Sequence, residues 1–144
     1  MTRRDADALA RACAEAMWAE DTASQAMGME LVHVGPGEAR MRMPITARMV
    51  NGHGICHGGY IFSLADSAFA FACNSRNDRM VAQHCAISYL RPAKRDMVLT
   101  ASAQERSRAG RSGIYDITVA EEGGAVIAVF RGTARSLGTK FFEE

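Results

Sequence analysis

Apolar residues at helical spacing mark the first part of the chain. Leu9, Cys13 and Met17 recur every four residues and predict an amphipathic helix within the first twenty residues. Gly28 is the residue expected to end this region. Residues 1–27 are therefore predicted to form an N-terminal helical segment.

The pattern then changes to the alternation of a strand. A turn at Gly35-Pro36-Gly37 is predicted to join two strands. In the second of these, apolar residues occupy every other position, at Ala39, Met41, Met43 and Ile45. Residues 48–57 contain turn formers such as Asn51-Gly52 and are expected to form a loop.

Residues 58–75 predict a second helix, which is apolar on nearly every side. A helix without a polar face is normally buried. Four strand patterns follow, at residues 81–90, 97–107, 112–120 and 125–136. The breaks between them are short, which predicts that neighbouring strands are antiparallel.

These elements predict an α+β fold in which one long buried helix is wrapped by an antiparallel sheet. A chain of 144 residues suits a single domain, here residues 1–144, with residues 139–144 as a C-terminal tail. Apolar residues make up 48% of the chain, so disorder is not expected as its main state.

The charge balance argues against some partners. The formal net charge is +1, so no global field favours nucleic acid or an anionic membrane. The longest apolar run, residues 60–73, is too short to span a bilayer and contains Asp66. The four cysteines form no Cys-x-x-Cys pair and follow no recognisable secretory signal, so free thiols in a reducing cytoplasm are expected.

Asp66 is the only formally charged residue between Arg48 and Arg76, and it falls in the middle of the apolar helix. Desolvation is expected to raise the pKa of a carboxyl group in such a place. A carboxylate of raised basicity suits a general base or a nucleophile near neutral pH. A structural aspartate, hydrogen-bonded to a neighbouring loop, is the alternative interpretation.

The same helix is predicted to begin at His57-Gly58-Gly59. The first amides of a helix have no partners within it, and they lie at the positive end of its dipole. Glycines leave these amides open to close approach, which favours a site that polarises a carbonyl or binds an oxyanion. A flexible glycine joint before a helix is the simpler alternative.

The spacing of Gly58 and Asp66 has a consequence for assembly. Eight residues of helix separate them by about 12 Å along the axis. A reacting carbonyl needs its donor and its attacking group within about 3 Å each. Asp66 therefore has to act against Gly58 of a second copy, which a two-fold dimer with antiparallel helices would provide.

Asn51 and His57 flank the helix start. Asn51 could orient the Asp66 carboxylate or a water, and His57 could help to hold the thiol side of a substrate. A common Asn-Gly turn and a histidine bonded to backbone are the alternatives. Neither a metal site at His53, Cys56 and His57 nor a Cys56–His57 nucleophile pair has a supporting signature, so no metal is expected.

Residues 91–111 contain six basic residues against two acidic ones. The turn from Arg108 to Ser112 combines guanidinium groups with open backbone amides, which suits a phosphate or pyrophosphate. Solvated charge at strand ends is the alternative. The residues proposed to bind such a group are Arg108, Gly110, Arg111 and Ser112.

Taken together, the motifs resemble those of the hotdog-fold acyl-CoA thioesterases, in particular the phenylacetic-acid-degradation branch. The resemblance extends from about Asp21 to Gly138. It is carried by Met49-Val50-Asn51-Gly52-His53, Cys56-His57-Gly58-Gly59, Phe62-Ser63-Leu64-Ala65-Asp66-Ser67-Ala68-Phe69-Ala70, Ala72-Cys73-Asn74-Ser75, Tyr89-Leu90-Arg91-Pro92, Gly113-Ile114-Tyr115-Asp116-Ile117 and Phe130-Arg131-Gly132.

This resemblance implies a hotdog fold of five to six strands, edge-to-edge dimers, usually tetramers, and thioester hydrolysis without a metal or cofactor. The family's catalytic acid corresponds to Asp66, its polarising amide to Gly58, and its supporting residues to Asn51 and His57. The turn at residues 108–112 corresponds to the region near the nucleotide end of CoA.

Three neighbouring residues depart from the family's pattern. Ala82 replaces a serine that some relatives carry near the active site, and Gln83 and His84 are less typical. These differences bear on the acyl group rather than on the reaction. The sequence therefore predicts a cytoplasmic thioesterase acting on small, aryl-acetyl CoA thioesters such as phenylacetyl-CoA or hydroxyphenylacetyl-CoA. A non-catalytic acyl-CoA sensor and an enoyl-CoA hydratase or dehydratase are the alternatives.

Overall fold

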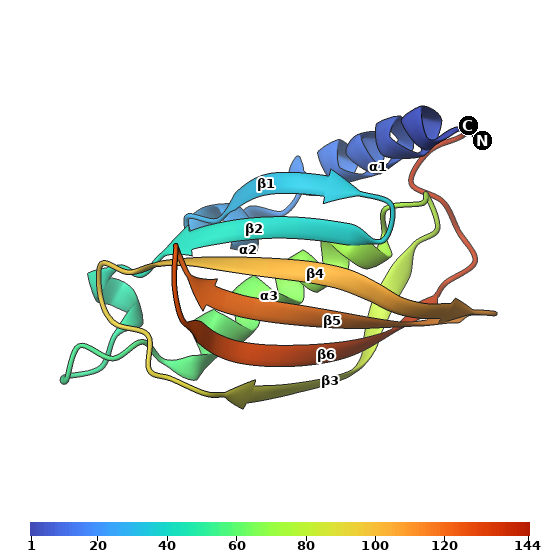
Figure 1. The fold of residues 1–144 in the computed structure, drawn as a ribbon. Coiled ribbons are helices and arrows are strands. Elements are labelled where there is room, and N and C mark those ends of the chain that lie inside the picture. Colours follow the sequence, from blue (N-terminus) through green and yellow to red (C-terminus); the bar gives the residue numbers. More distant parts are fainter.

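The computed structural model describes residues 1–144. Its centre is the long helix α3 (Gly58–Cys73), wrapped by a curved antiparallel sheet of six strands (Figure 1). The strands are β1 (Glu30–Gly35), β2 (Glu38–Pro44), β3 (Met80–Tyr89), β4 (Val98–Ala109), β5 (Ser112–Glu121) and β6 (Val126–Ser136). This confirms the predicted α+β architecture.

The N-terminal segment folds as two helices, α1 (Arg3–Trp18) and α2 (Thr22–Ala26). Thr2 caps α1, because its hydroxyl accepts from the Asp5 amide at 3.1 Å while the Asp5 carboxylate accepts from the Thr2 backbone. The small residues Ala10, Cys13 and Ala14 are buried on one side of α1. The helix packs against the outer strand β1 (Figure 1).

The strand order is β1-β2-β4-β5-β6-β3. Every pairing in the sheet is antiparallel, as predicted, but β3 and β4, which are consecutive in the chain, do not pair with each other. Both sides of β4 are occupied, by β2 and by β5, so β3 pairs instead with β6 at the edge of the sheet. Residues 90–97 carry the chain from this edge back to β4.

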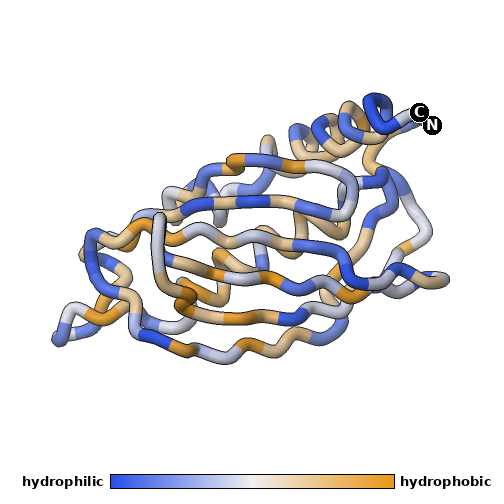
Figure 2. Tube along the Cα trace, viewed as in Figure 1, coloured by the Kyte–Doolittle hydropathy of each residue, from blue (hydrophilic) through white to orange (hydrophobic).

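Contacts between α3 and the sheet form the core. Phe69 of α3 packs against Tyr115 and Phe130, with ring centroids 5.7 and 5.9 Å apart. Gly132 leaves the space that the Phe69 ring fills, since a Cβ at this glycine would lie 2.7 Å from the ring. Figure 2 shows apolar residues along α3 and interspersed with polar ones along the strands of the sheet.

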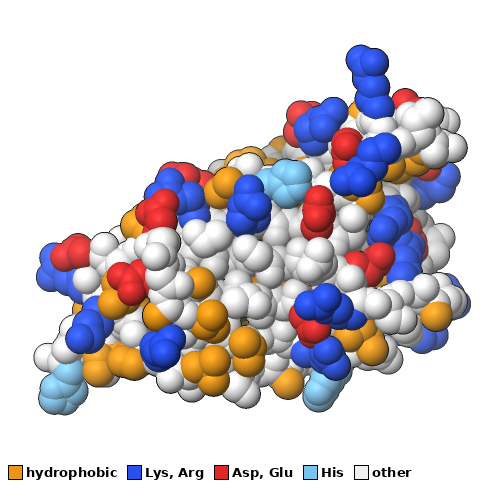
Figure 3. All heavy atoms as spheres, in the orientation of Figure 1, with side chains coloured by type: hydrophobic (Ala, Val, Ile, Leu, Met, Phe, Trp, Pro, Cys, Tyr) orange, Lys and Arg blue, Asp and Glu red, His pale blue; other side chains and the backbone are white.

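The outer edge of β3 is bare. Most of this strand is exposed, and it pairs only with β6. Val81 on β3 and Val129 on β6 are exposed by 47% and 42%, and Figure 3 shows hydrophobic side chains gathered over these two strands. An unpaired strand edge with apolar neighbours is a typical site of association.

Two further features bear on the predictions. None of the helices combines the length and the hydropathy needed to cross a bilayer. The C-terminal residues 139–144 form no helix or strand, but Asn77 anchors them. Its carboxamide donates to the Phe142 carbonyl at 2.8 Å and accepts from the Phe141 amide at 2.9 Å.

Candidate active site

Asp66 lies halfway along α3 and is partly buried. Its carboxylate makes no hydrogen bond or ion pair with any group of the chain, so the interpretation of a structural aspartate bonded to a loop finds no support. Burial raises the pKa of Asp66 above its ordinary value. The side chain is therefore an uncompensated carboxylate of increased basicity.

Asp66 lies on the side of α3 that is close to the bare strand edge. The pKa of the Cys85 thiol on β3 is raised by burial and, in addition, by the negative charge of Asp66. The residues of β3 that depart from the family's pattern, Ala82, Gln83 and His84, are all exposed there. A bulge falls between Ala82 and His84.

The start of α3 offers free backbone donors. His57 is the N-cap residue, but its side chain makes no capping hydrogen bond. The amides of Gly58 and Gly59 have no acceptor within the chain. Gly58 is half-buried and Gly59 is exposed, so both amides can meet a ligand at the positive end of the helix dipole.

Gly58 lies in close contact with a tyrosine, which the sequence did not indicate. Tyr89, the last residue of β3, donates its hydroxyl to the Gly58 carbonyl at 2.9 Å. A Cβ at position 58 would lie 2.9 Å from the Tyr89 ring. The glycine is thus more than a flexible joint. Tyr89-Leu90-Arg91-Pro92 is one of the motifs that carry the family resemblance, but the sequence alone does not indicate that Tyr89 contacts Gly58.

Asn51 organises the loop before α3. Its side-chain oxygen accepts from the amides of His53 at 2.9 Å and Ile55 at 3.1 Å, which leaves the carboxamide nitrogen free. His57 is exposed, and its backbone amide donates to the Met49 carbonyl at 2.8 Å. The structure therefore places Asn51 and His57 near the start of α3.

Asp66 does not join this group within one chain. It lies on the same unbroken helix as Gly58, eight residues further on, which corresponds to about 12 Å along the axis. No single carbonyl can contact both groups of one protomer. If both groups act on one carbonyl, a second copy of the chain therefore has to supply one of them.

The turn between β4 and β5 lies at the other end of α3 from Gly58 (Figure 1). Arg108 donates to Asp78 at 2.6 Å, and Asp78 also accepts from the Ser136 hydroxyl at 2.6 Å. Gly110, with a φ of 60°, and Arg111 are exposed at the tip, while Ser112 is half-buried. Arg108 is thus held by the fold, whereas Arg111 is available to a ligand.

The basic residues of segment 91–111 are not brought together in one protomer. Arg95 bonds through its amide to the Gly54 carbonyl, near the start of α3. Arg106 pairs with Asp116 at 2.9 Å. Because β4 separates the two ends of the segment by roughly 35 Å, a single compact anion site cannot include them all.

Burial disfavours the thiolate form of the cysteines. Burial raises the pKa of Cys56, whose sulfur donates weakly to the His57 carbonyl at 3.4 Å. Burial likewise raises the pKa of Cys73 to about 12. No group of three histidine, cysteine, aspartate or glutamate side chains is placed to hold a metal ion.

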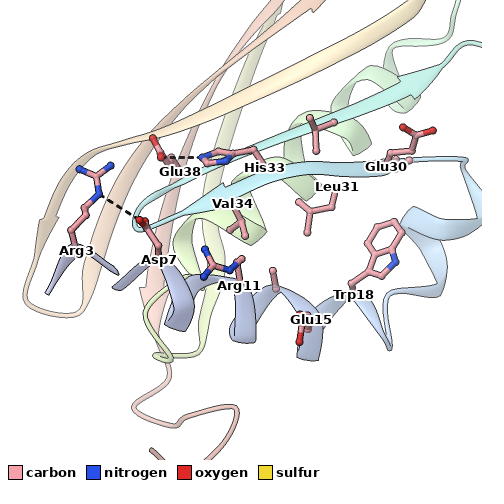
Figure 4. A pocket seen from close by; sticks show the side chains of 13 residues that line it. Arg3, Asp7, Arg11, Glu15, Trp18, Glu30, Leu31, His33, Val34 and Glu38 are labelled. Atoms are coloured by element: carbon pink, nitrogen blue, oxygen red, sulfur yellow. Dashed lines mark hydrogen bonds and ion pairs between the residues drawn. The ribbon is translucent and has the colours of Figure 1, made fainter. Parts of the chain in front are cut away.

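Two cavities differ in their relation to these groups. A cavity of about 430 Å³ borders Gly58 and is lined mainly by apolar residues, including Ile55, Ile61 and Leu90. A larger one, about 730 Å³, lies between α1 and β1 (Figure 4). The larger cavity contains none of the predicted site residues, so only the smaller one adjoins the candidate site.

Known proteins are similar to this chain in sequence and in fold. The sequence model of the thioesterase superfamily matches residues 53–128 of this chain. The acyl-coenzyme A thioesterase PaaI of Escherichia coli is 42% identical over 125 residues, covering 87% of this chain and 89% of that protein.

Solved structures agree with this match. The E. coli PaaI protein from the phenylacetic acid degradation operon superposes with a TM-score of 0.92 at 40% identity, covering 94% of this chain and 98% of the other. The TT0310 protein of Thermus thermophilus gives a TM-score of 0.78 at 37% identity, covering 82% and 99%. The chain has the hotdog fold and belongs to the thioesterase superfamily.

Proposed function

We propose that this protein hydrolyses acyl-CoA thioesters, and that its preferred acyl groups are small aryl-acetyl groups such as phenylacetyl and hydroxyphenylacetyl. The observation that carries the proposal is the unpaired carboxylate of Asp66, whose pKa is raised by burial, on the helix that also presents the free amide of Gly58. The names of the relatives, a PaaI thioesterase and a protein of a phenylacetic acid degradation operon, point to the same chemistry.

The Gly58 amide would donate a hydrogen bond to the thioester carbonyl oxygen. This bond strengthens as negative charge develops on that oxygen, so it lowers the barrier to attack. Asp66 of the partner chain can act by either of two routes. It can attack the carbonyl carbon directly, expelling CoA thiolate to leave an anhydride for water to cleave, or it can take a proton from the attacking water.

A second copy of the chain would complete the site. The bare edge of β3 and the exposed side chains of Val81 and Val129 offer a surface for it next to the Asp66 side of α3. With antiparallel helices across a two-fold axis, each Asp66 would approach the partner's helix start. We propose a homodimer on this edge, associating further into a tetramer as a dimer of dimers.

The same arrangement accounts for the distant position of the CoA-binding turn. In one protomer, residues 108–112 lie near the end of α3, roughly 22 Å along the helix from Gly58. Antiparallel pairing would bring this turn to the side where the partner's helix begins. Gly110, Arg111 and Ser112, with Arg108 supporting the turn from behind, would then meet the nucleotide part of CoA.

The cavity beside Gly58 supports a small, apolar acyl group. Its volume of about 430 Å³ is within the usual range for small-molecule pockets, and its lining is mainly hydrophobic. The four free thiols fit a reducing compartment, which favours the cytoplasm. We further propose that residues 1–144 act as one thioesterase domain that requires no cofactor or metal.

A panel of CoA thioesters with aryl and alkyl acyl groups of matched size tests this proposal. The expected result is thiol release that is fastest with the aryl-acetyl members and is lost in Asp66→Asn. Tight binding without thiol release would favour the sensor. Loss of the enoyl absorbance of crotonyl-CoA without thiol release would favour a hydratase, and either result would overturn the proposal.

A further inference from the structure

The first turn of α3 has little restraint of its own beyond the hydrogen bond from the His57 amide to the Met49 carbonyl. It begins with two glycines, the least restricted residues of the backbone, and the N-cap His57 provides no side-chain cap. A donor displaced by about 1 Å from a reacting carbonyl can cost on the order of 100-fold in rate. A group outside the helix therefore has to hold these amides in place.

Tyr89 makes two contacts with this segment from the end of β3. Its hydroxyl donates to the Gly58 carbonyl at 2.9 Å, and this is the only side-chain hydrogen bond that Gly58 makes. Its ring occupies the space next to the Gly58 Cα, with ring atoms 2.9 to 3.2 Å from the position of a Cβ. The tyrosine and the glycine are therefore sterically complementary.

These contacts act on both free amides. The Gly58 carbonyl and the Gly59 N–H belong to one planar peptide group, so a hydrogen bond to the carbonyl polarises the N–H on its other side. The ring packs beside the Gly58 Cα, next to the bond that carries the Gly58 N–H. Tyr89 also lines the apolar cavity beside Gly58.

We propose that Tyr89 is a positioning residue, which fixes the Gly58-Gly59 amides in the direction that the thioester carbonyl requires. The inference rests on the proposed thioesterase function. The Tyr89 hydroxyl acts through the backbone of Gly58, so its loss affects the turnover step. The ring also lines the cavity proposed for the acyl group, so only a variant that keeps the ring isolates the positioning role.

Tyr89→Phe tests the hydrogen bond alone, because it keeps the ring. Its kcat should fall about fivefold with KM unchanged, the effect of losing one neutral hydrogen bond. Tyr89→Ala removes the ring as well and should lower kcat by about 100-fold. Tyr60→Phe is the matched control, because Tyr60 is on the same helix and its hydroxyl makes no hydrogen bond; its kcat should not change.

A spectroscopic measurement separates positioning from a general loss of structure. In protein labelled with ¹⁵N-glycine, the amide resonances of Gly58 and Gly59 should shift in Tyr89→Phe, whereas that of the distant Gly124 should stay in place. The midpoint of urea unfolding should stay close to that of the wild type, because Tyr89→Phe keeps the ring and its contacts. An unchanged kcat in Tyr89→Phe, a loss expressed only in KM, or unmoved glycine resonances would overturn the assignment.

Asp66→Asn, assayed in parallel, keeps the two proposals apart. If this variant is inactive while Tyr89→Phe turns over at the wild-type rate, the thioesterase mechanism stands and the role of Tyr89 is rejected. If Asp66→Asn retains wild-type hydrolysis, the mechanism itself is wrong. A fall in kcat in Tyr89→Phe together with an inactive Asp66→Asn supports both.

Discussion

At the scale of single residues, Asp66 sets activity against stability. One folded chain buries this carboxylate partly and gives it no partner of its own, so within a protomer its ionisation opposes folding at neutral pH. The same basicity is what a nucleophile or general base needs near neutral pH. A residue that destabilises the fold while serving the reaction is common in active sites.

Asp66→Asn should therefore lower turnover while stabilising the protein. We expect kcat to fall by about 10² to 10⁴-fold, the usual contribution of a catalytic acid or base. At pH 7 the urea midpoint should rise, because the folded state no longer holds an unfavourable charge. A variant that is inactive and also less stable at pH 7 would contradict this account.

The pH dependence follows from the direction of the Asp66 shift. Because the folded pKa lies above the ordinary value of 3.8, kcat/KM should fall as the pH drops through that raised pKa. The stability cost of the charge is fully present above the raised pKa and disappears below 3.8, where both states are protonated. The advantage of Asp66→Asn in urea should vanish over the same window. An acid limb at or below pH 3.8 would contradict the assignment.

The pKa values of two other carboxylates are shifted in the opposite direction to that of Asp66. Burial opposes the ionisation of Glu105, but hydrogen bonds from Arg76 and Tyr115 outweigh it and lower the pKa of Glu105. The hydrogen bond from Arg131 is the main cause of the lowered pKa of Asp116. Their stabilisation is present above the ordinary carboxyl pKa and is lost as the pH falls through the lowered values.

At the scale of elements, the packing of α3 on β6 depends on the missing side chain at Gly132. A methyl group there would lie 2.7 Å from the Phe69 ring. Gly132→Ala should destabilise the fold by about 1–3 kcal/mol, measured by urea unfolding. Gly124→Ala, where a Cβ meets nothing within 4 Å, is the matched control and should stay within about 0.5 kcal/mol of the wild type. Equal effects of the two changes would refute this packing argument.

Two arginines of the β4–β5 turn, Arg108 and Arg111, have different roles. Arg111→Ala should raise KM for acyl-CoA about tenfold, because an exposed guanidinium would lose a hydrogen bond to phosphate. Its KM for the same acyl group on pantetheine, which lacks the nucleotide, should not change. Equal changes with both substrates would exclude contact between Arg111 and the nucleotide.

Arg108→Ala should act on the fold instead. It removes the partner of Asp78 at 2.6 Å, so the midpoint of urea unfolding should fall. A loss of CoA affinity in this variant without any loss of stability would reverse the two roles.

Local pattern was enough to predict most elements, and the reason is physical. Alternation in β2 and the all-round apolar helix around Asp66 report burial directly. The pairing of β3 was not predictable in this way, because competition for the edges of β4 is decided by the whole sheet. For the same reason, the contact between Tyr89 and Gly58 joins residues 31 positions apart and leaves no periodic signal.

The candidate site could be predicted from the sequence only in part, for a similar reason. Gly58 and Asp66 stand out through composition and helix spacing, which are local properties. The ion pair of Arg108 with Asp78 depends on a contact across 30 positions, so the sequence suggested an open guanidinium where the fold holds a paired one. The side-chain oxygen of Asn51 likewise accepts hydrogen bonds from amides of its own loop.

At the scale of the whole molecule, the protomer is incomplete in two ways. Its helix separates the donor and the carboxylate by about 12 Å. Its sheet ends in a bare strand beside that carboxylate. A second copy bound along β3 would bring a donor to the carboxylate and would also cover the bare strand. The dimer and the reaction therefore depend on each other.

The central claim is that two chains share each reaction centre, and mixing two impaired variants tests it most directly. Asp66→Asn keeps the amide of Gly58, whereas Gly58→Ala keeps Asp66 but forces a methyl group against Tyr89. Asp66→Asn alone should be near background, and Gly58→Ala alone should turn over at about 1% of the wild-type rate, the loss expected when Tyr89 is displaced. A hybrid dimer would contain one site with both an intact Gly58 and an intact Asp66.

Equal co-expression of the two variants should make half of all dimers hybrid, with one intact site in each. The predicted turnover is about one quarter of the wild-type value per chain, with each variant alone at about 1% or less. Background turnover in the mixture, with hybrids proven by differently tagged subunits, would show that each chain builds its own site and would contradict the account.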